Sequence, residues 1–104
     1  GRRIMPAVAQ LVSYLVDYNM DIEAAMAQPR INATGDGRTT VDPQLSADEQ
    51  QAIAAAIATV PGERAVYPVL YAAPQAVARD PASRRNSGAA DPALPWSGAV
   101  AEPD

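Results

Sequence analysis

The sequence is short and acidic, with 104 residues, 12 acidic side chains, 8 basic ones and a formal net charge of -4. Its length allows one domain at most. Because the chain contains no His and no Cys, it cannot build by itself a zinc site, a catalytic thiol or a Ser-His-Asp triad. The negative charge disfavours nucleic acid as a partner, since binding there depends chiefly on neutralising phosphates. We also expect no membrane span, because no apolar run approaches the roughly 18 residues that a span requires.

Large apolar side chains are scarce. Leu, Ile and Val together account for 19 residues, Phe is absent, and 23 of the hydrophobic residues are Ala. That supply is just under the roughly 20% below which burial does not offset the entropy cost of ordering a chain. We therefore expect the chain to be a segment of a larger protein and to fold poorly by itself. The first residue is Gly rather than Met, in keeping with this expectation.

The first predicted elements are two helices. Apolar residues at intervals of three and four predict a helix over residues 4–18: Ile4, Val8, Leu11, Val12 and Leu15. Pro6 stands in its first turn, where an N–H is not needed, and Asn19 can end it in a left-handed conformation. Asp21 is expected to cap a second helix over residues 22–28.

The middle of the chain combines a loop, a strand and a third helix. Residues 32–37 predict a loop because Asn, Thr, Gly and Asp cluster there without periodicity. Residues 38–42 form a candidate strand. Ser46 and Glu49 match the spacing of a capping box, which predicts a third helix that begins at Ala47 and ends before Pro61-Gly62.

The last third has β character. Residues 64–71 form a β-prone run, and segments 75–79 and 84–89 flank a turn-forming sequence at 80–83, which predicts a hairpin. From residue 91 onward, prolines indicate an irregular tail laid over a surface. Helices followed by strands predict an α+β fold.

The residues alone offer few candidate sites. Three carboxylates near the helix corner could bind a metal or act as acid and base, although capping and solvated roles are the favoured interpretation: Asp17, Asp21 and Glu23. Two arginine pairs could bind an anion, or be solvated or paired with carboxylates: Arg2-Arg3 and Arg84-Arg85. Trp96 could stack on a ligand, but we favour an anchor that holds the tail to a surface.

Five short motifs occur in a distinctive order along nearly the whole chain. They are Gly1-Arg2-Arg3-Ile4, Asp17-Tyr18-Asn19-Met20, Pro29-Arg30-Ile31, Gln75-Ala76-Val77 and Gly88-Ala89-Ala90-Asp91-Pro92. In order and spacing they resemble the C-terminal part of the small subunit of gamma-glutamyltransferases. In that family a Gly-Gly-Ser-Arg-Ile stretch opens a helix, an Asp-aromatic-Gly-Met stretch closes it and an Ala-Pro-Arg stretch ends the next one. A Gln-x-Ile strand and a Gly-Ala-Ser-Asp-Pro-Arg signature follow.

The resemblance implies an Ntn-hydrolase, whose four-layer αββα sandwich would include residues 1–104 as a C-terminal segment. Autoproteolysis would create an N-terminal Thr that takes a gamma-glutamyl group from a glutathione-type donor and passes it to water or an amino acid. Because Gly1 has no hydroxyl, that Thr would lie on another segment, and the chain would be inactive alone. The implied partners are the rest of the small subunit, the large subunit and a gamma-glutamyl small molecule. No cofactor or metal is implied.

Gly1 is the one catalytic candidate that the resemblance assigns to this chain. The family builds its oxyanion hole from backbone amides of paired glycines, and Gly1 aligns with the second of them. A small residue there lets the amide approach the developing negative charge. The alternative is a Gly that simply starts a helix. Arg3 matches the family's Arg, for which we expect structural pairing.

Several positions depart from the family pattern. Arg2 stands where Ser is frequent, Asn32-Ala33-Thr34 replaces a His-His-Gln stretch, and Ala93 replaces the Arg after Asp-Pro. Because of these changes, a second interpretation stays open, in which the chain belongs to a related acylase that hydrolyses an amide or lactam side chain. An alternative of another class is a noncatalytic module whose first helix docks into a partner's groove. Typical bacterial members of the family imply a periplasmic or secreted location.

Overall fold

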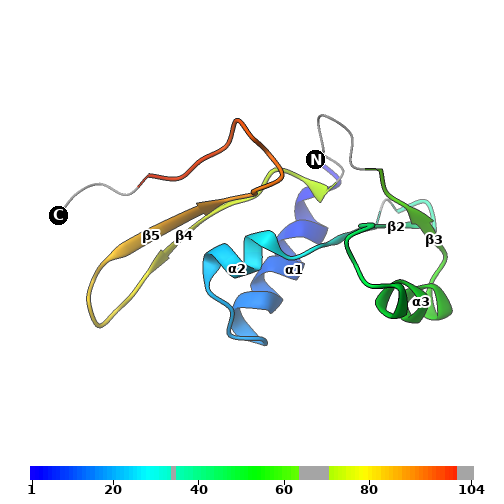
Figure 1. The fold of residues 1–104 in the computed structure, drawn as a ribbon, viewed down its shortest axis with the longest axis horizontal. Helices are drawn as coiled ribbons and strands as arrows, with labels where there is room; N and C mark the ends of the chain where they lie inside the picture. Colours follow the sequence, from blue (N-terminus) through cyan, green and yellow to red (C-terminus); the bar gives the residue numbers. More distant parts are fainter. Residues whose placement is uncertain (34, 64–70, 101–104) are drawn as a thin grey trace. The chain divides into compact units, whose positions relative to one another are not determined.

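A computed structural model describes residues 1–33, 35–63 and 71–100, and it confirms an α+β fold (Figure 1). The chain divides into two compact units. The first comprises Gly1–Gln10 and Pro29–Ala72, and the second comprises Leu11–Gln28 and Ala73–Asp104. Helix α1 (Ile4–Val16) supplies residues to both units.

The two predicted N-terminal helices are confirmed, with small differences at their ends. Helix α1 ends at Val16, two residues before the predicted end, and Asn19 adopts a φ of 52°, in the left-handed region. Asp21 is the N-cap of α2 (Ile22–Ala27), and its carboxylate accepts a hydrogen bond from the Ala24 N–H at 2.7 Å. The carboxylate satisfies one of the N–H groups that the first turn of a helix leaves without a partner.

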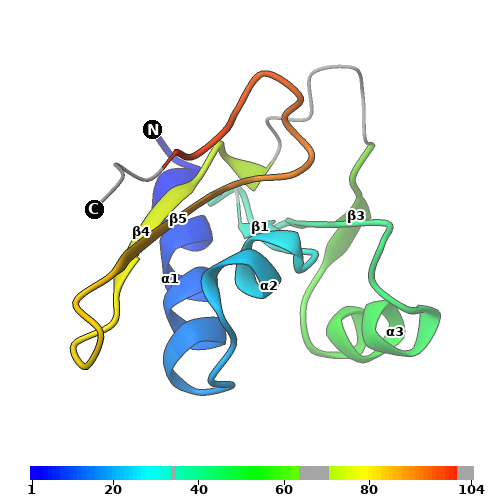
Figure 2. The ribbon, with the colours of Figure 1, turned by 60° about the vertical axis from the view of Figure 1, so that its left-hand side comes forward.

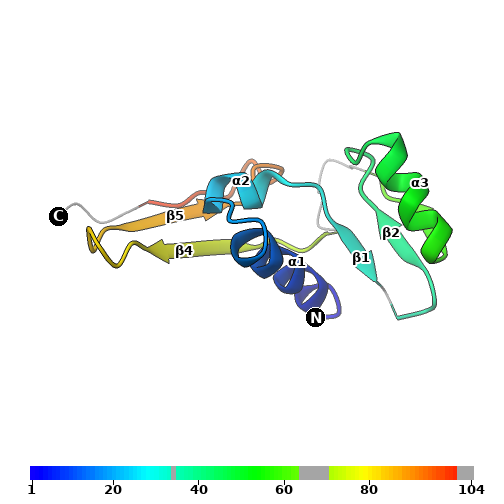
Figure 3. The ribbon, with the colours of Figure 1, turned by 90° about the horizontal axis from the view of Figure 1, so that it is seen from below.

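The first unit contains a three-stranded sheet in the order β1-β2-β3, whose bounds are β1 (Ile31–Ala33), β2 (Thr39–Val41) and β3 (Thr59–Pro61). Strands β1 and β2 are antiparallel, with Asn32 opposite Thr40, and β2 and β3 are parallel, with Thr40 opposite Val60. Helix α3 (Ala47–Ala56) makes the connection between the two parallel strands (Figures 2 and 3).

The structure corrects two of the predicted elements and the order of strands and helices. The predicted loop over residues 32–37 is wrong at its start, because Asn32 lies within β1 and only 2% of it is exposed. The turn itself uses Gly35 and Gly37, whose φ values of 82° and 83° suit glycine. Helix α3 ends at Ala56, well before the predicted stop at Pro61. The chain turns extended at Ile57, and the residues that follow pair with β2. Two strands therefore precede the third helix.

The capping box at the start of α3 is confirmed. The Ser46 hydroxyl accepts a hydrogen bond from the Glu49 N–H at 3.2 Å, and the Glu49 carboxylate accepts one from the Ser46 N–H at 2.8 Å. Helix α3 buries none of its residues. Its stability therefore depends more on this cap and on propensity than on an apolar face.

Buried polar groups are a main feature of the first unit. Only 4% of Arg30 and 1% of Asp42 are exposed, and the Asp42 N–H donates to the Arg30 carbonyl at 3.2 Å. The Arg30 guanidinium donates to the Tyr71 carbonyl at 3.2 Å. Tyr71 also limits the room at Gly62, where an added Cβ would collide with the Tyr71 hydroxyl and stand 2.9 Å from Thr40 Cγ2. Gly62 is therefore required by close packing.

The second unit has a small apolar core between helices and a hairpin. The hairpin consists of β4 (Gln75–Arg79) and β5 (Asn86–Ala90), paired antiparallel, and α2 packs against it (Figure 3). The buried residues of this core are Leu11, Ile22, Ala25, Met26 and Ala89. On the other face of β4, Val77 is 81% exposed.

The predicted hairpin and tail are both confirmed, and β5 begins at Asn86 rather than at residue 84. The Asp80 carboxylate organises the turn, because it accepts hydrogen bonds from the Ala82 and Ser83 N–H groups and from the Ser83 hydroxyl. These bonds lower the pKa of Asp80, and the bond from the Ser83 hydroxyl has the largest effect. The irregular tail crosses β5, since a Cβ on Gly88 would lie 3.0 Å from the Ala99 Cβ. The predicted strand over 64–71 lies outside the described residues, apart from Tyr71.

Acidification should weaken the α3 cap. The Ser46 N–H, and after it the Ser46 hydroxyl, lower the pKa of Glu49. A carboxyl whose pKa is lower in the folded state contributes stability above its unfolded pKa and loses it as pH falls through the folded pKa. We expect the Ser46 amide resonance to move with the titration of Glu49 in NMR spectra. In Glu49→Gln, which keeps an acceptor but cannot ionise, that pH dependence should vanish; its persistence would contradict the assignment.

The close packing at Gly62 makes a second prediction. Gly62→Ala should lower the free energy of unfolding by about 1–3 kcal/mol, because the methyl group overpacks the contact with Tyr71 and Thr40. Gly98→Ala is the matched control, since a Cβ there meets nothing within 4 Å. Denaturant unfolding of both variants of the complete protein measures the difference. Equal effects of the two substitutions would show that Gly62 is not crowded in solution.

Candidate functional site

The amino-terminal end of α1 is the site where the sequence placed its catalytic candidate. The Gly1 carbonyl accepts from the Ile4 N–H at 3.2 Å, and the Arg3 carbonyl accepts from the Ala7 N–H at 3.3 Å. No acidic residue occupies the first turn of α1. The positive end of the helix dipole and the exposed side chains of Arg2 and Arg3 therefore favour negative charge at this end.

The surroundings of Gly1 differ from those of Gly62. A Cβ built on Gly1 meets nothing within 4 Å, whereas one built on Gly62 collides with its neighbours. Packing within the described chain therefore does not explain a glycine at position 1.

Gln10 holds this end of α1 to the sheet of the first unit. Its carboxamide accepts from the Ile31 N–H at 2.8 Å and donates to the Ile31 carbonyl at 2.7 Å. The same Nε2 donates to the carbonyl of Pro6, in the first turn, at 2.8 Å. One half-buried side chain thus makes two hydrogen bonds to β1 and a third to the first turn of its own helix.

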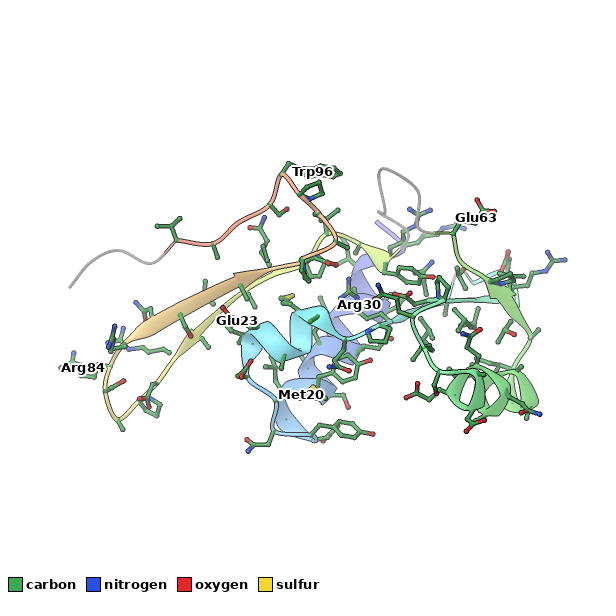
Figure 4. The ribbon with its side chains drawn as sticks, in the orientation of Figure 1. Met20, Glu23, Arg30, Glu63, Arg84 and Trp96 are labelled. Atoms are coloured by element: carbon green, nitrogen blue, oxygen red, sulfur yellow. The ribbon has the colours of Figure 1, made fainter. Side chains whose placement is uncertain are left out.

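The carboxylates at the helix corner have local roles. The Asp17 carboxylate accepts from the Ser13 hydroxyl at 2.6 Å, and Asp21 caps α2. Glu23 lies exposed in the first turn of α2, where a negative charge suits the helix dipole (Figure 4). Across residues 1–33, 35–63 and 71–100, no cluster of three or more His, Cys, Asp or Glu residues could hold a metal.

The remaining candidates lie in the second unit. Arg84 and Arg85 are exposed near the hairpin turn, and Arg84 has a φ of 60° (Figure 4). Trp96 lies in the tail and is 57% exposed. A shallow groove lies between α2, β5 and the tail, where the Asp91 carboxylate accepts from the Ala93 N–H at 2.9 Å. Asp91 thereby shapes the start of the tail.

Sequence reasoning missed the roles of Gln10 and Arg30. Nothing local in the sequence showed that Gln10 contacts a residue 21 positions away. One signal was present, because Gln10 lies three residues after Ala7 and beside Leu11, both buried. A polar residue on the buried face of a helix is expected to have a hydrogen-bond partner.

The fold of the chain is similar to that of several solved enzyme structures. A gamma-glutamyltranspeptidase from Pseudomonas nitroreducens, complexed with L-DON, has a TM-score of 0.71 at 17% identity, covering 96% of this chain and 51% of that one. The transpeptidase enzyme CapD from Bacillus anthracis has a TM-score of 0.75 at 14% identity, with 96% and 58% covered. A cephalosporin acylase from Bacillus halodurans has a TM-score of 0.75 at 20% identity, with 89% and 18% covered. These likenesses establish the fold.

The family follows from the sequence. The model of the gamma-glutamyltranspeptidase family matches residues 1–100, so the chain belongs to that family, as its motifs predicted. It spans about half the length of the first of these solved chains. Among curated protein sequences, none matches significantly. Within the described ranges, no helix has the length and apolar character needed to cross a membrane.

Proposed function

We propose that residues 1–104 are the C-terminal segment of the small subunit of an enzyme that transfers or hydrolyses gamma-glutamyl groups from glutathione-type donors. The observation that carries this proposal is the family match over residues 1–100. The rest of the small subunit and the large subunit are the proposed partners. The nucleophilic Thr belongs to that remainder, so the segment is inactive by itself.

The proposed reaction is acyl transfer in two steps. The hydroxyl oxygen of an N-terminal Thr attacks the γ-carbonyl carbon of the donor, and its proton passes to the α-amino group of the same residue. The amine of the donor leaves with that proton, and a gamma-glutamyl ester remains. Water or an amino acid then attacks the ester and restores the Thr hydroxyl. Each attack places negative charge on the carbonyl oxygen, and this charge requires hydrogen-bond donors.

In this proposal the Gly1 amide is one of those donors. The electrostatics of the helix end support the assignment, since the exposed Arg2 side chain and the helix dipole both favour negative charge. In a segment that continues upstream, the nitrogen of Gly1 is a neutral peptide amide, the form that donates to an oxyanion.

The exposed apolar surface supports a role within a larger sandwich. Five large apolar side chains on α1 are more than half exposed, and four of them recur at intervals of three and four: Met5 (80%), Val8 (51%), Val12 (51%) and Val16 (74%), with Ile4 (58%) beside them. Helix α1 is therefore apolar on this face as well as on the buried face that carries Leu11. Helices with apolar residues on more than one face are typically buried in a larger core. We propose that other segments of the enzyme cover the exposed face.

A related acylase is the second candidate. The cephalosporin acylase likeness has a TM-score equal to that of the transpeptidase CapD. Arg2, Asn32 and Ala93 also depart from the motifs on which the gamma-glutamyl assignment is based. The acyl-transfer chemistry is the same in both candidates, and the donor's acyl group distinguishes them.

The complete protein should release the anilide from a gamma-glutamyl anilide faster than it cleaves a glutaryl amide. The physical reason is that a donor with a charged α-amino group offers contacts that the glutaryl group lacks. Comparing kcat/KM for the two substrates measures the preference. The reverse preference would identify an acylase, and failure to turn over either substrate would refute both enzyme proposals in favour of a noncatalytic binding module.

The role of Gly1 can be tested with a matched pair of variants. Gly1→Pro removes the amide hydrogen and should lower kcat by about 100- to 1,000-fold, the cost of losing one oxyanion donor. Gly1→Ala keeps that hydrogen, and its Cβ meets nothing within 4 Å, so kcat should stay near wild type. Both variants should unfold at the wild-type denaturant concentration. Equal kcat values for the two variants would remove Gly1 from the oxyanion hole.

A further inference from the structure

We propose that Gln10 is the positioning residue that sets the amino-terminal end of α1 against the sheet. It would thereby fix where the Gly1 amide stands. This inference rests on the proposed role of Gly1. It assigns to Gln10 no contact with substrate, and its action is through the helix and β1.

The contact occurs at an unpaired sheet edge. Strand β1 lies at the edge of its sheet. The Arg30 carbonyl accepts a hydrogen bond from the Asp42 N–H, so the backbone groups of Arg30 face β2. Successive residues of a strand point their backbone N–H and carbonyl groups to opposite sides, and those of Ile31 therefore point away from β2. Gln10 pairs with both of these groups. Its carboxamide therefore takes the place of a neighbouring strand at this one residue.

Glutamine is chemically suited to this position. A carboxamide presents one acceptor and a donor group side by side, which matches the N–H and carbonyl of a single residue. The additional bond from Nε2 to the Pro6 carbonyl holds the side chain against its own helix. An ionised Glu has the same shape but no donor, so it would face two carbonyl oxygens. Leu has neither a donor nor an acceptor, and it would leave the Ile31 peptide without these partners.

The link from Gln10 to Gly1 is short and continuous. Pro6 belongs to the first turn of α1, and the Gly1 carbonyl accepts from the N–H of Ile4, the first residue of that helix. A helix moves as a body, so loss of the Ile31 contacts lets the start of α1 shift relative to β1. A displacement of about 1 Å in a catalytic group can cost on the order of 100-fold in rate.

Hydrogen exchange in the wild-type complete protein tests the contact itself. The Ile31 amide should exchange slowly, because Gln10 accepts its hydrogen. The Ala33 amide is the internal control. Ala33 is exposed and lies two residues after Ile31 in β1, so its N–H also points away from β2. Ile31 exchanging as fast as Ala33 would overturn the proposal without any mutation.

Kinetics of Gln10→Leu and Gln10→Glu in the complete protein test the consequence. We expect kcat to fall by about 10- to 100-fold while KM changes by less than about twofold, because orientation is lost and substrate binding is not. Ile31 should lose its protection in Gln10→Leu, which has no acceptor for its N–H, whereas Gln10→Glu keeps an acceptor and loses the two donated bonds. Gln51→Leu and Gln51→Glu, at an exposed position of α3, are the matched controls and should leave kcat unchanged.

The outcomes separate this inference from the proposed function. If Ile31 loses protection in Gln10→Leu while kcat is retained, Gln10 does not position the site. If KM rises and kcat does not fall, Gln10 affects binding and the proposal is wrong. Should Gln10→Leu fail to fold, the isosteric Gln10→Glu carries the kinetic test. No turnover by the wild-type protein, with Ile31 protected, would refute the proposed function while the Gln10 contact stands.

Discussion

The scarcity of large apolar side chains is the constraint on which the rest of the structure depends. Helix α1 shows it most clearly, because Leu11 is buried while Met5 and Val16, on the same helix, are 80% and 74% exposed. The second unit gathers a core of five buried residues, two of them Ala. Apolar burial contributes roughly 25 cal/mol per Å², so Ala contributes little. Helix α1 carries further large apolar side chains, but within the described chain they are exposed and do not add to the core.

The first unit replaces apolar packing with directed polar contacts. Gln10 binds the Ile31 peptide, Arg30 donates to the Tyr71 carbonyl, and the Asp42 carboxylate accepts from the Gln44 N–H at 3.0 Å. Each such bond contributes only about 1 kcal/mol net, but breaking one that leaves a buried group without a partner costs about 1–3 kcal/mol. Contacts of this kind add little stability and strongly specify register. They are suited to fixing the position of a helix end.

Local sequence signals predicted elements whose causes are local. The caps at Asp21 and Ser46 and the hairpin turn at Asp80 were predicted because side chains bond backbone groups two or three residues away. Strands β1 and β3 were missed because each has three residues and exists only through pairing with β2. The candidate site divides in the same way. The motif around Gly1 was recognisable in the sequence, whereas the contact of Gln10 with Ile31 spans 21 positions and has no local signature.

Backbone chemistry explains how the fold can match its relatives at 14–20% identity. A peptide amide that donates to an oxyanion, and a peptide edge that receives a carboxamide, place few demands on the surrounding side chains. The position of Gly1 requires only a small residue, and the position of Gln10 requires only a side-chain amide of the right length. Recognition of a donor's acyl group instead requires particular side chains. Under the proposed function, divergence at Arg2, Asn32 and Ala93 is therefore expected to alter specificity before it alters the acyl-transfer step.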